Sequence, residues 1–262
     1  MITTWSMGMP EVNMSEQILI DLHDIVARHP WWSARADLVL ALVGKLNIRA
    51  PATVLEAGCG WGVNLEAFEA AGYQITGLDV SRKMLDRLDR DDRRLVEADL
   101  SQDLPDILPT YDCVLALDVI EHIDDDCYAL QQLGRLLKPT SRLIVSVPAL
   151  PELFSEFDDV QGHRRRYTGE ALRACIEDAG LIIEDMLWWG QWMVRWLMAR
   201  KARPRGRSGE APVDVYRRYL SLPPWPGPSV MRIMYSIDRR RTLHRRNVTG
   251  TSLIAVVSRH LS

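Results

Sequence analysis

The sequence predicts an α/β fold in which a largely parallel sheet is covered by helices on both faces. From residue 51 onward, short aliphatic and β-branched runs alternate with amphipathic helical segments. Gly58, Gly60 and Gly62 join the first of these runs to the first helical segment, and Asp79 ends the second run. Open α/β sheets bind ligands at the carboxyl ends of their strands, so these residues predict a nucleotide-like ligand there.

Seven strands and four intervening helices are expected in order along this region. The strands are expected at residues 53–57, 74–79, 94–98, 112–117, 142–147, 181–187 and 251–258. The helices are expected at residues 62–71, 81–89, 125–137 and 168–179. Strand–helix alternation favours parallel pairing, because a parallel connection needs a crossover segment that is usually a helix.

The chain divides into four segments by pattern. Residues 1–50 are expected to form an N-terminal helical cap, with its helices broken at Pro30. Residues 51–187 are expected to form the core domain, and residues 251–262 its final strand. Residues 188–250 break the alternation and are rich in Trp and Arg. Their prolines and glycines predict a helical lid inserted between the last two strands.

Composition indicates a cytoplasmic protein with one sizeable core. The chain has 262 residues, of which 47% are hydrophobic. Its four cysteines have neither metal-ligand nor redox spacing, so reduced thiols are expected. The start of the sequence has no pattern typical of a secretion signal. The longest apolar run, residues 186–199, contains Arg195 and is too short to span a bilayer.

Charge is distributed unevenly along the chain. Residues 195–262 hold 15 Lys and Arg against 3 Asp and Glu, whereas residues 1–194 hold 17 against 32. A basic C-terminal part indicates an anionic partner, or else attraction between the two parts of the chain. The acidic body and the lack of an RNA-binding module argue against a nucleic-acid partner.

The glycine cluster has the spacing G-x-G-x-G, which lets the backbone turn sharply and a ligand approach closely. The helix that follows offers unpaired N–H groups and a positive dipole end. A dinucleotide site favours G-x-G-x-x-G, but residue 63 is Val63, which makes an NAD-dependent oxidoreductase the weaker alternative. Asp79 could accept hydrogen bonds from both ribose hydroxyls, and Asp99 could contact an adenine amino group.

Five stretches resemble successive motifs of the class I S-adenosylmethionine-dependent methyltransferases. They are "VLEAGCGWGVNL", "ITGLDVS", "VEADL", "YDCVLALDVIEHIDDD" and "LKPTSRLIVSVPAL", and the likeness returns at "GTSLIAVVSR". The resemblance implies a Rossmann-like seven-stranded sheet with an antiparallel last strand, and S-adenosyl-L-methionine as cofactor. Onto this sequence it carries a cofactor site of Glu56, Gly58, Cys59, Gly60, Gly62, Asp79, Val80, Asp99, Leu100 and Leu117.

A narrower likeness covers "HPWWSARADLVL" and "FSEFDDVQGHRRRYTGEALRACIEDAGL". These stretches are similar to a bacterial subgroup grouped with the ubiquinone-type and type 11 or 23 methyltransferases. The likeness implies a small-molecule or lipid-like acceptor and a role for Arg35 in binding the cofactor carboxylate. The alternative is that Trp31, Trp32 and Arg35 simply pack the N-terminal helix onto the sheet.

Methyl transfer needs an acceptor held in line with the methyl group, and a hydroxyl acceptor also needs a base. The candidate bases are His122 and His163, which follow strand ends on the cofactor side. Tyr167 is expected to face the same pocket beside His163. Arg164, Arg165 and Arg166 could clamp an anionic acceptor, or could bond their own loop to "EFDD", with at least one of them structural.

Asp118, Glu121 and His122 could also bind a divalent metal ion. Ubiquinone-type O-methyltransferases carry a similar E-x-x-E-H pattern, but the first acid here is Asp118. The favoured interpretation is therefore a site without metal, in which the acids at 124–126 serve a helix N-terminus.

The Trp-rich segment allows three interpretations. Trp188, Trp192 and Trp196 would share one face of a helix, and basic residues follow them at Arg195, Arg200, Lys201, Arg203, Arg205 and Arg207. Such a helix could rest on an anionic membrane, form a homodimer contact, or pack as a lid on its own domain.

The sequence thus predicts a methyltransferase that transfers a methyl group from S-adenosyl-L-methionine to an O or N atom of a small-molecule or lipid-like acceptor. The alternative from another class is a membrane-surface or partner-binding protein that retains this fold.

Overall fold

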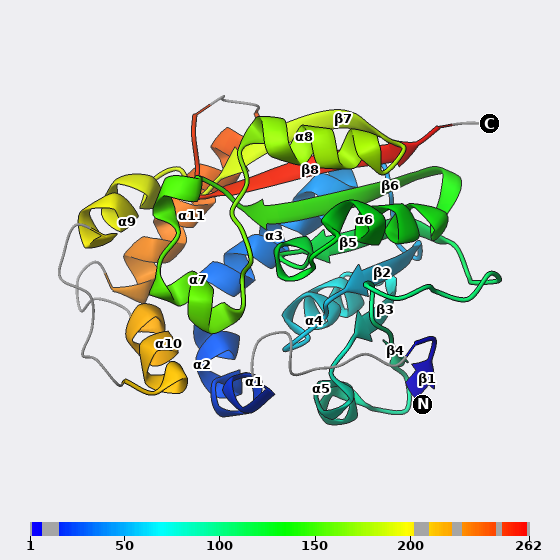
Figure 1. Ribbon diagram of the computed structural model, residues 1–262, viewed down its shortest axis with the longest axis horizontal. Coiled ribbons are helices and arrows are strands. Elements are labelled where there is room, and N and C mark those ends of the chain that lie inside the picture. The colour runs from blue at the N-terminus through cyan, green and yellow to red at the C-terminus, as the bar shows by residue number, and fades with distance from the viewer. Residues whose placement is uncertain (1, 7–15, 202–209, 222–226, 245–247, 261–262) are drawn as a thin grey trace.

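The computed structural model describes residues 2–6, 16–201, 210–221, 227–244 and 248–260, without the side chains of residues 16, 17, 200 and 201. Its central feature is an eight-stranded sheet in the order β1-β4-β3-β2-β5-β6-β8-β7 (Figure 1). The strands are β1 (Ile2–Thr4), β2 (Thr53–Ala57), β3 (Gln74–Asp79), β4 (Arg94–Glu97), β5 (Tyr111–Leu117), β6 (Leu137–Pro148), β7 (Leu181–Trp189) and β8 (Ser252–Arg259).

Strand pairing confirms the expected α/β fold. Strands β1 to β6 pair in parallel, whereas β8 lies antiparallel between β6 and β7. The antiparallel last strand is therefore confirmed, as are the seven expected strands. The eighth strand, β1, was not predicted, because three residues are too few to show a periodic pattern.

Helices cover both faces of the sheet (Figure 1). One core layer packs α6 and α8 against the sheet, and the other packs α3, α4, α5 and α11. The helices are α1 (Glu16–Asp21), α2 (His23–Arg28), α3 (Pro30–Lys45), α4 (Val63–Ala70), α5 (Arg82–Leu88), α6 (Asp126–Arg135), α7 (Glu156–Gln161), α8 (Gly169–Asp178), α9 (Met193–Lys201), α10 (Pro212–Leu220) and α11 (Pro228–Leu243). Among these described helices, none is long and apolar enough to cross a membrane.

Local chemistry fixes where several helices begin. Pro30 starts α3, where its missing N–H is not needed, and the His29 ring accepts a hydrogen bond from Trp31 N at 3.2 Å. The Asp125 carboxylate accepts from Tyr128 N at the start of α6. The Thr168 hydroxyl accepts from Ala171 N at the start of α8.

The segment between β7 and β8 carries α9, α10 and α11. Strand β7 runs to Trp189, so Trp188 belongs to the sheet and α9 begins only at Met193. The expectation that Trp188, Trp192 and Trp196 share one helical face is therefore wrong. The strand continues because Trp188 and Trp189 pair with the start of β8. The basic residues Arg203, Arg205 and Arg207, and the side chains of Arg200 and Lys201, lie outside the described part of the chain.

Candidate active site

The glycine loop after β2 forms the floor of the site. Gly58, Gly60 and Gly62 have φ angles of 70°, 45° and 75°, in the left-handed region that glycine tolerates best. A Cβ on Gly58 would lie 2.5 Å from Val119 Cγ2, so the loop also needs hydrogen at this position. Val119, which follows β5, and α5 thus leave no room for a side chain at Gly58 and Gly62.

Gly62 has a packing role rather than a place in the cavity. It precedes the first residue of α4, and a Cβ on it would lie 2.6 Å from Leu88 Cδ2 on α5. It is absent from the described residues that line the cavity above the loop. Its neighbours Trp61, Val63 and Asn64 do line that cavity, so the expected contact between Gly62 and the cofactor stays a prediction.

Asp79 ties the glycine loop to the end of β3. One carboxylate oxygen accepts a hydrogen bond from Gly60 N at 2.8 Å, and the other accepts from Ser81 N at 2.9 Å. The side chain is almost fully buried and lines the cavity. Two backbone donors hold this carboxylate in one orientation.

A cavity of about 690 Å³ opens above this loop. The structure brings together around it all the residues expected to bind the cofactor except Gly62. They are Arg35, Glu56, Gly58, Cys59, Gly60, Asp79, Val80, Asp99, Leu100 and Leu117. Trp61 and Asn64 also line it and were not singled out from the sequence.

Buried acceptor atoms in this cavity indicate what it can hold. The Asn64 amide donates to one oxygen of Glu56. The other oxygen of Glu56 and the carbonyl oxygen of Asn64 are buried without a hydrogen-bond partner among the described residues. Burial raises the pKa of Glu56 to about 8. An ammonium group would satisfy both free acceptors, so the amino-acid part of S-adenosylmethionine fits the donor set that is present.

Arg35 connects the N-terminal helices to the sheet. Its guanidinium donates to Asp118, which follows β5 with a φ of 57°, and it lies 4.7 Å above the ring of Trp31. Ser146 donates to the other oxygen of Asp118 at 2.9 Å. The Nε atom of Arg35 remains buried without a partner among the described residues. Arg35 thus both packs α3 onto the sheet and lines the cavity.

His163 stands at the junction of two cavities. Its Nδ1 lies 2.9 Å from Asp158 Oδ1, and its Nε2 lies 3.9 Å from Glu121 Oε1. Arg166 donates two further hydrogen bonds to Asp158, at 2.7 and 3.1 Å. Burial alone would raise the pKa of Asp158, but His163 and Arg166 together hold it below its usual value. A permanently ionised carboxylate therefore orients the imidazole.

His122 lies edge-on to His163, with the ring centroids 4.8 Å apart. Burial, and next the charge of His163, lower the pKa of His122 to about 3, so this ring is neutral. Beside it, burial and the charge of Asp118 raise the pKa of Glu121 well above its ordinary value. Ligand atoms of Glu121, His122 and His163 lie within 4.8 Å of one another. The metal alternative would therefore use His163 in place of Asp118, which pairs with Arg35.

Tyr167 is not among the described residues that line either cavity. It is 2% exposed, and its hydroxyl donates to Asp126 Oδ2 at 2.5 Å. Its backbone bonds to Pro148 and Leu150 draw the ring into the core beneath α6 and α8. The expectation that Tyr167 faces the pocket is wrong for this reason.

The three arginines before Tyr167 bond to two different segments. Arg166 donates to Asp158 within "EFDD", as the loop interpretation expects. Arg164 and Arg165 instead donate to the carbonyls of His122 and Asp124, in the segment that follows β5. At least one of the three arginines is therefore structural, as expected.

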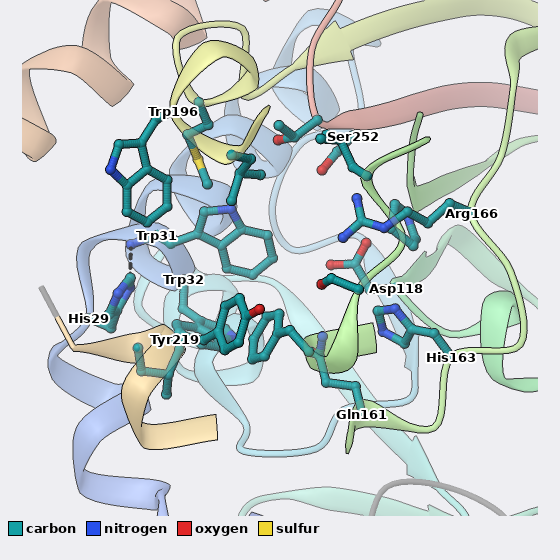
Figure 2. Close-up of a pocket in the computed structure, with 18 of the residues that line it drawn as sticks. His29, Trp31, Trp32, Asp118, Gln161, His163, Arg166, Trp196, Tyr219 and Ser252 are labelled. Carbon is teal, nitrogen blue, oxygen red and sulfur yellow. Dashed lines mark hydrogen bonds between the residues drawn. The ribbon is translucent and has the colours of Figure 1, made fainter. Parts of the chain in front are cut away.

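A second cavity of about 230 Å³ adjoins the first (Figure 2). Trp31, Trp32, Asp118, Gln161 and His163 line both. Figure 2 shows aromatic side chains on one side, and Asp118, His163 and Arg166 on the other. The aromatic walls come from α3, α7, α9, α10 and α11, through Trp31, Trp32, Phe157, Trp196, Tyr219 and Tyr235. Phe157, Tyr219 and Tyr235 were missed from the sequence, because no local motif marks a wall assembled from five helices.

Comparison with known proteins agrees with this geometry. A family model described as a methyltransferase domain matches residues 31–185. The malonyl-[acyl-carrier protein] O-methyltransferase of Pseudescherichia vulneris is 32% identical over 60% of this chain and 61% of its own length. A ubiquinone biosynthesis O-methyltransferase of Pseudomonas paraeruginosa is 30% identical over 45% of this chain and 57% of its own. The matches thus span less than two thirds of these relatives.

The fold itself also has counterparts among solved structures. An S-adenosylmethionine-dependent methyltransferase of Clostridium acetobutylicum superimposes with a TM-score of 0.52. The superposition covers 87% of this chain and 92% of that protein, at 13% sequence identity.

Proposed function

Because this chain belongs to the methyltransferase-domain family, we propose that it transfers a methyl group from S-adenosylmethionine to a hydroxyl oxygen of a neutral, largely apolar small molecule. The observation that carries the proposal is His163, which lines both cavities and is oriented by Asp158. Both relatives described above are named O-methyltransferases, which supports oxygen rather than nitrogen as the accepting atom.

The larger cavity is the cofactor site in this proposal. When bound, S-adenosylmethionine supplies an electrophilic methyl group on a sulfonium. Glu56 and Asn64 would accept hydrogen bonds from its ammonium group, and Asp79 would accept from its ribose hydroxyls. Arg35 has one buried donor free among the described residues to bind its carboxylate. Asp99 and Leu100 would flank the adenine.

The smaller cavity is the acceptor site. Its two charged side chains among the described residues, Asp118 and Arg166, are already paired with Arg35 and Asp158. Burial lowers the pKa of His29, on the same wall, to about 4, so that ring is neutral. A charged acceptor would therefore lose its hydration without gaining a partner, which favours a neutral one. The aromatic walls favour a ring system or another broad apolar body.

His163 is the base in this mechanism. With Nδ1–H donated to Asp158, Nε2 is the atom left to accept the proton of an acceptor hydroxyl. Asp158 and Arg166 are positioning residues, because they act through the imidazole. His122 is disfavoured as the base, since its pKa of about 3 makes it a poor proton acceptor at neutral pH.

Two measurements test this function. Calorimetric titration with S-adenosylhomocysteine should show saturable binding, which Asp79→Ala should weaken. Methyl transfer from labelled S-adenosylmethionine should then be measured on 2-naphthol and on 6-hydroxy-2-naphthoate, a matched neutral and anionic pair. The expected result is transfer to oxygen of 2-naphthol, which His163→Gln slows by about 10²-fold or more.

Preference for the anionic acceptor would contradict the neutral site. Binding of S-adenosylhomocysteine without turnover on any hydroxyl compound would favour a binding protein that retains the fold.

A further inference from the structure

The outward side of α11 carries a row of exposed apolar side chains. Val230, Ile233 and Ile237 are 39%, 60% and 44% exposed. Their spacing of three and four residues places them on one side of the helix. Met231 and Tyr235 lie on the inward side, where they are buried and line the acceptor cavity. One helix therefore forms both a cavity wall and an exposed apolar face.

Basic residues accompany this row. Arg232, Arg240 and Arg241 are exposed on α11. A shallow depression in its surface is lined by Ile237, Arg240, Arg241 and His244. Close to the same end of the helix, Lys45 of α3 donates to the carbonyl of Leu243.

Acidic side chains do little to balance this charge. Asp238, the one acid in the sequence of α11, is buried and accepts hydrogen bonds from Gly190 N at 2.9 Å and Gln191 N at 3.1 Å. The half-exposed pair between Arg239 and Asp37 neutralises one further arginine, with 3.6 Å between the charged atoms.

We propose that this face, defined by Val230, Ile233, Ile237, Arg240 and Arg241, docks on a membrane containing anionic lipids. An apolar row flanked by arginines is the pattern by which a helix lies in a lipid headgroup layer. A second copy of this chain fits the face poorly, because a symmetric contact would set the same arginines against one another. Charge complementarity thus favours anionic lipid as the occupant.

The docking surface differs from the one suggested by the tryptophan run in the sequence. Trp189 is fully buried and Trp192 packs against Tyr235, with ring centroids 5.3 Å apart. If the proposed function also holds, α11 would bring the acceptor cavity close to the lipid phase, where apolar acceptors concentrate. That consequence rests on the proposed function, whereas the docking itself does not.

Vesicle flotation tests the docking. The full chain is expected to float with vesicles of phosphatidylglycerol and phosphatidylcholine, less at high salt, and not with phosphatidylcholine alone. The double variant Ile233→Asp/Ile237→Asp is expected to lower the partition coefficient by about tenfold or more. Ile107→Asp is the matched control, because Ile107 is 94% exposed on a loop elsewhere and its change should have no effect.

Charge reversal gives an independent arm of the experiment. Arg240→Glu/Arg241→Glu is expected to weaken partition by about tenfold or more, since an anionic surface attracts basic residues and repels the carboxylates that replace them. Arg49→Glu/Arg87→Glu makes the same change in net charge at other exposed positions and should have little effect on partition into the vesicles. Thermal melting checks that each variant is folded.

Three results would overturn the docking proposal. The first is that the protein does not float with anionic vesicles, and the second is that it floats equally well with neutral ones. The third is that the variants and their control variants lose the same amount of vesicle binding. If the protein forms a dimer that Ile233→Asp dissociates, the partner of this face is a second copy of the chain and not a lipid surface. Titration with S-adenosylhomocysteine on the same samples separates the two proposals, because docking variants should retain that affinity. Flotation without any such binding would leave docking intact and contradict the proposed function.

Discussion

Asp158 receives hydrogen bonds from two side chains that face the acceptor cavity, His163 Nδ1 at 2.9 Å and Arg166 Nε at 2.7 Å. The carboxylate itself is completely buried. It also caps α7 through the Ser155 backbone N–H at 2.9 Å, so the short helix and the imidazole share one anchor. This arrangement fixes His163 in space before any acceptor arrives, and it makes Asp158 the first residue to test.

We expect Asp158→Asn to lower the rate of methyl transfer by about 10²-fold or more, because an amide can hold His163 in the wrong tautomer. Affinity for S-adenosylhomocysteine should not change, since Asp158 does not line the cofactor cavity. The pH–rate profile separates positioning from simple loss of structure. If the variant keeps the wild-type rate and profile, His163 is not oriented by this carboxylate during catalysis.

Glu56 predicts that cofactor binding depends on pH. Its pKa is raised to about 8 by burial, so in the free protein the carboxyl is mostly protonated below that pH. Binding an ammonium group favours the ionised form. Affinity for S-adenosylhomocysteine should therefore fall as pH drops below 8, by up to about tenfold per pH unit. Calorimetric titrations at pH values from about 6 to about 8 measure this change in affinity, because the pKa of Glu56 lies at the upper end of that interval.

The matched variant for this experiment is Glu56→Gln, which cannot ionise. It should bind more weakly at pH 8 but show a flat profile over the same range. An unchanged slope in Glu56→Gln would assign the pH dependence to another group.

The stability lost in Gly58→Ala should be partly restored by a second substitution at Val119. In Gly58→Ala the new methyl would lie 2.5 Å from Val119 Cγ2, and the φ of 70° adds strain. We expect a loss of stability of about 1–3 kcal/mol together with weaker cofactor binding. Adding Val119→Ala removes the clash and should restore part of both, as measured by denaturant unfolding and calorimetry.

Gly60→Ala is the comparison for this pair. Gly60 also has a positive φ, but its nearest contact to a built Cβ is 3.9 Å away. It should lose less stability than Gly58→Ala, and Val119→Ala should not rescue it. Equal losses at the two positions would show that backbone strain, not the contact with Val119, sets the cost.

Tyr167→Phe tests the correction made to the sequence-based prediction. Removing the hydroxyl deletes its hydrogen bond to Asp126, and a bond to a charged group contributes about 1.5–3 kcal/mol. The melting temperature should therefore fall, while the rate of methyl transfer at a temperature well below it stays unchanged. If the rate of methyl transfer falls by more than the fraction of folded protein does, Tyr167 takes part in catalysis and the correction is wrong.

Sequence patterns predicted the strands well, and also which residues gather around the larger cavity, because both depend on short-range order. The glycine spacing and the position of Asp79 at a strand end are local signals, and parallel topology brings them to one edge of the sheet. Tyr167 could not be placed in this way, since its direction depends on a bond to Asp126, 41 residues away.

Residues that are distant in sequence but close in space were also missed, because no local pattern marks such contacts. The sulfur atoms of Cys127 and Cys175 lie 2.9 Å apart, although they are separated by 48 residues and had shown no motif spacing. The cavity walls on α7, α10 and α11 were likewise not predicted, because which side of a short helix faces a cavity depends on how the helix packs against distant parts of the chain.

The two cavities draw their walls from different stretches of the chain. Most of the larger one is built between Glu56 and Asp125, whereas much of the smaller one comes from residues 192–252, far along the sequence. Substitutions on the inward sides of α9 and α11, which do not line the larger cavity, can therefore alter acceptor preference while the glycine loop stays intact. For protein engineering, a combinatorial library confined to those helices would explore new acceptors without repeatedly sacrificing the methyl donor site.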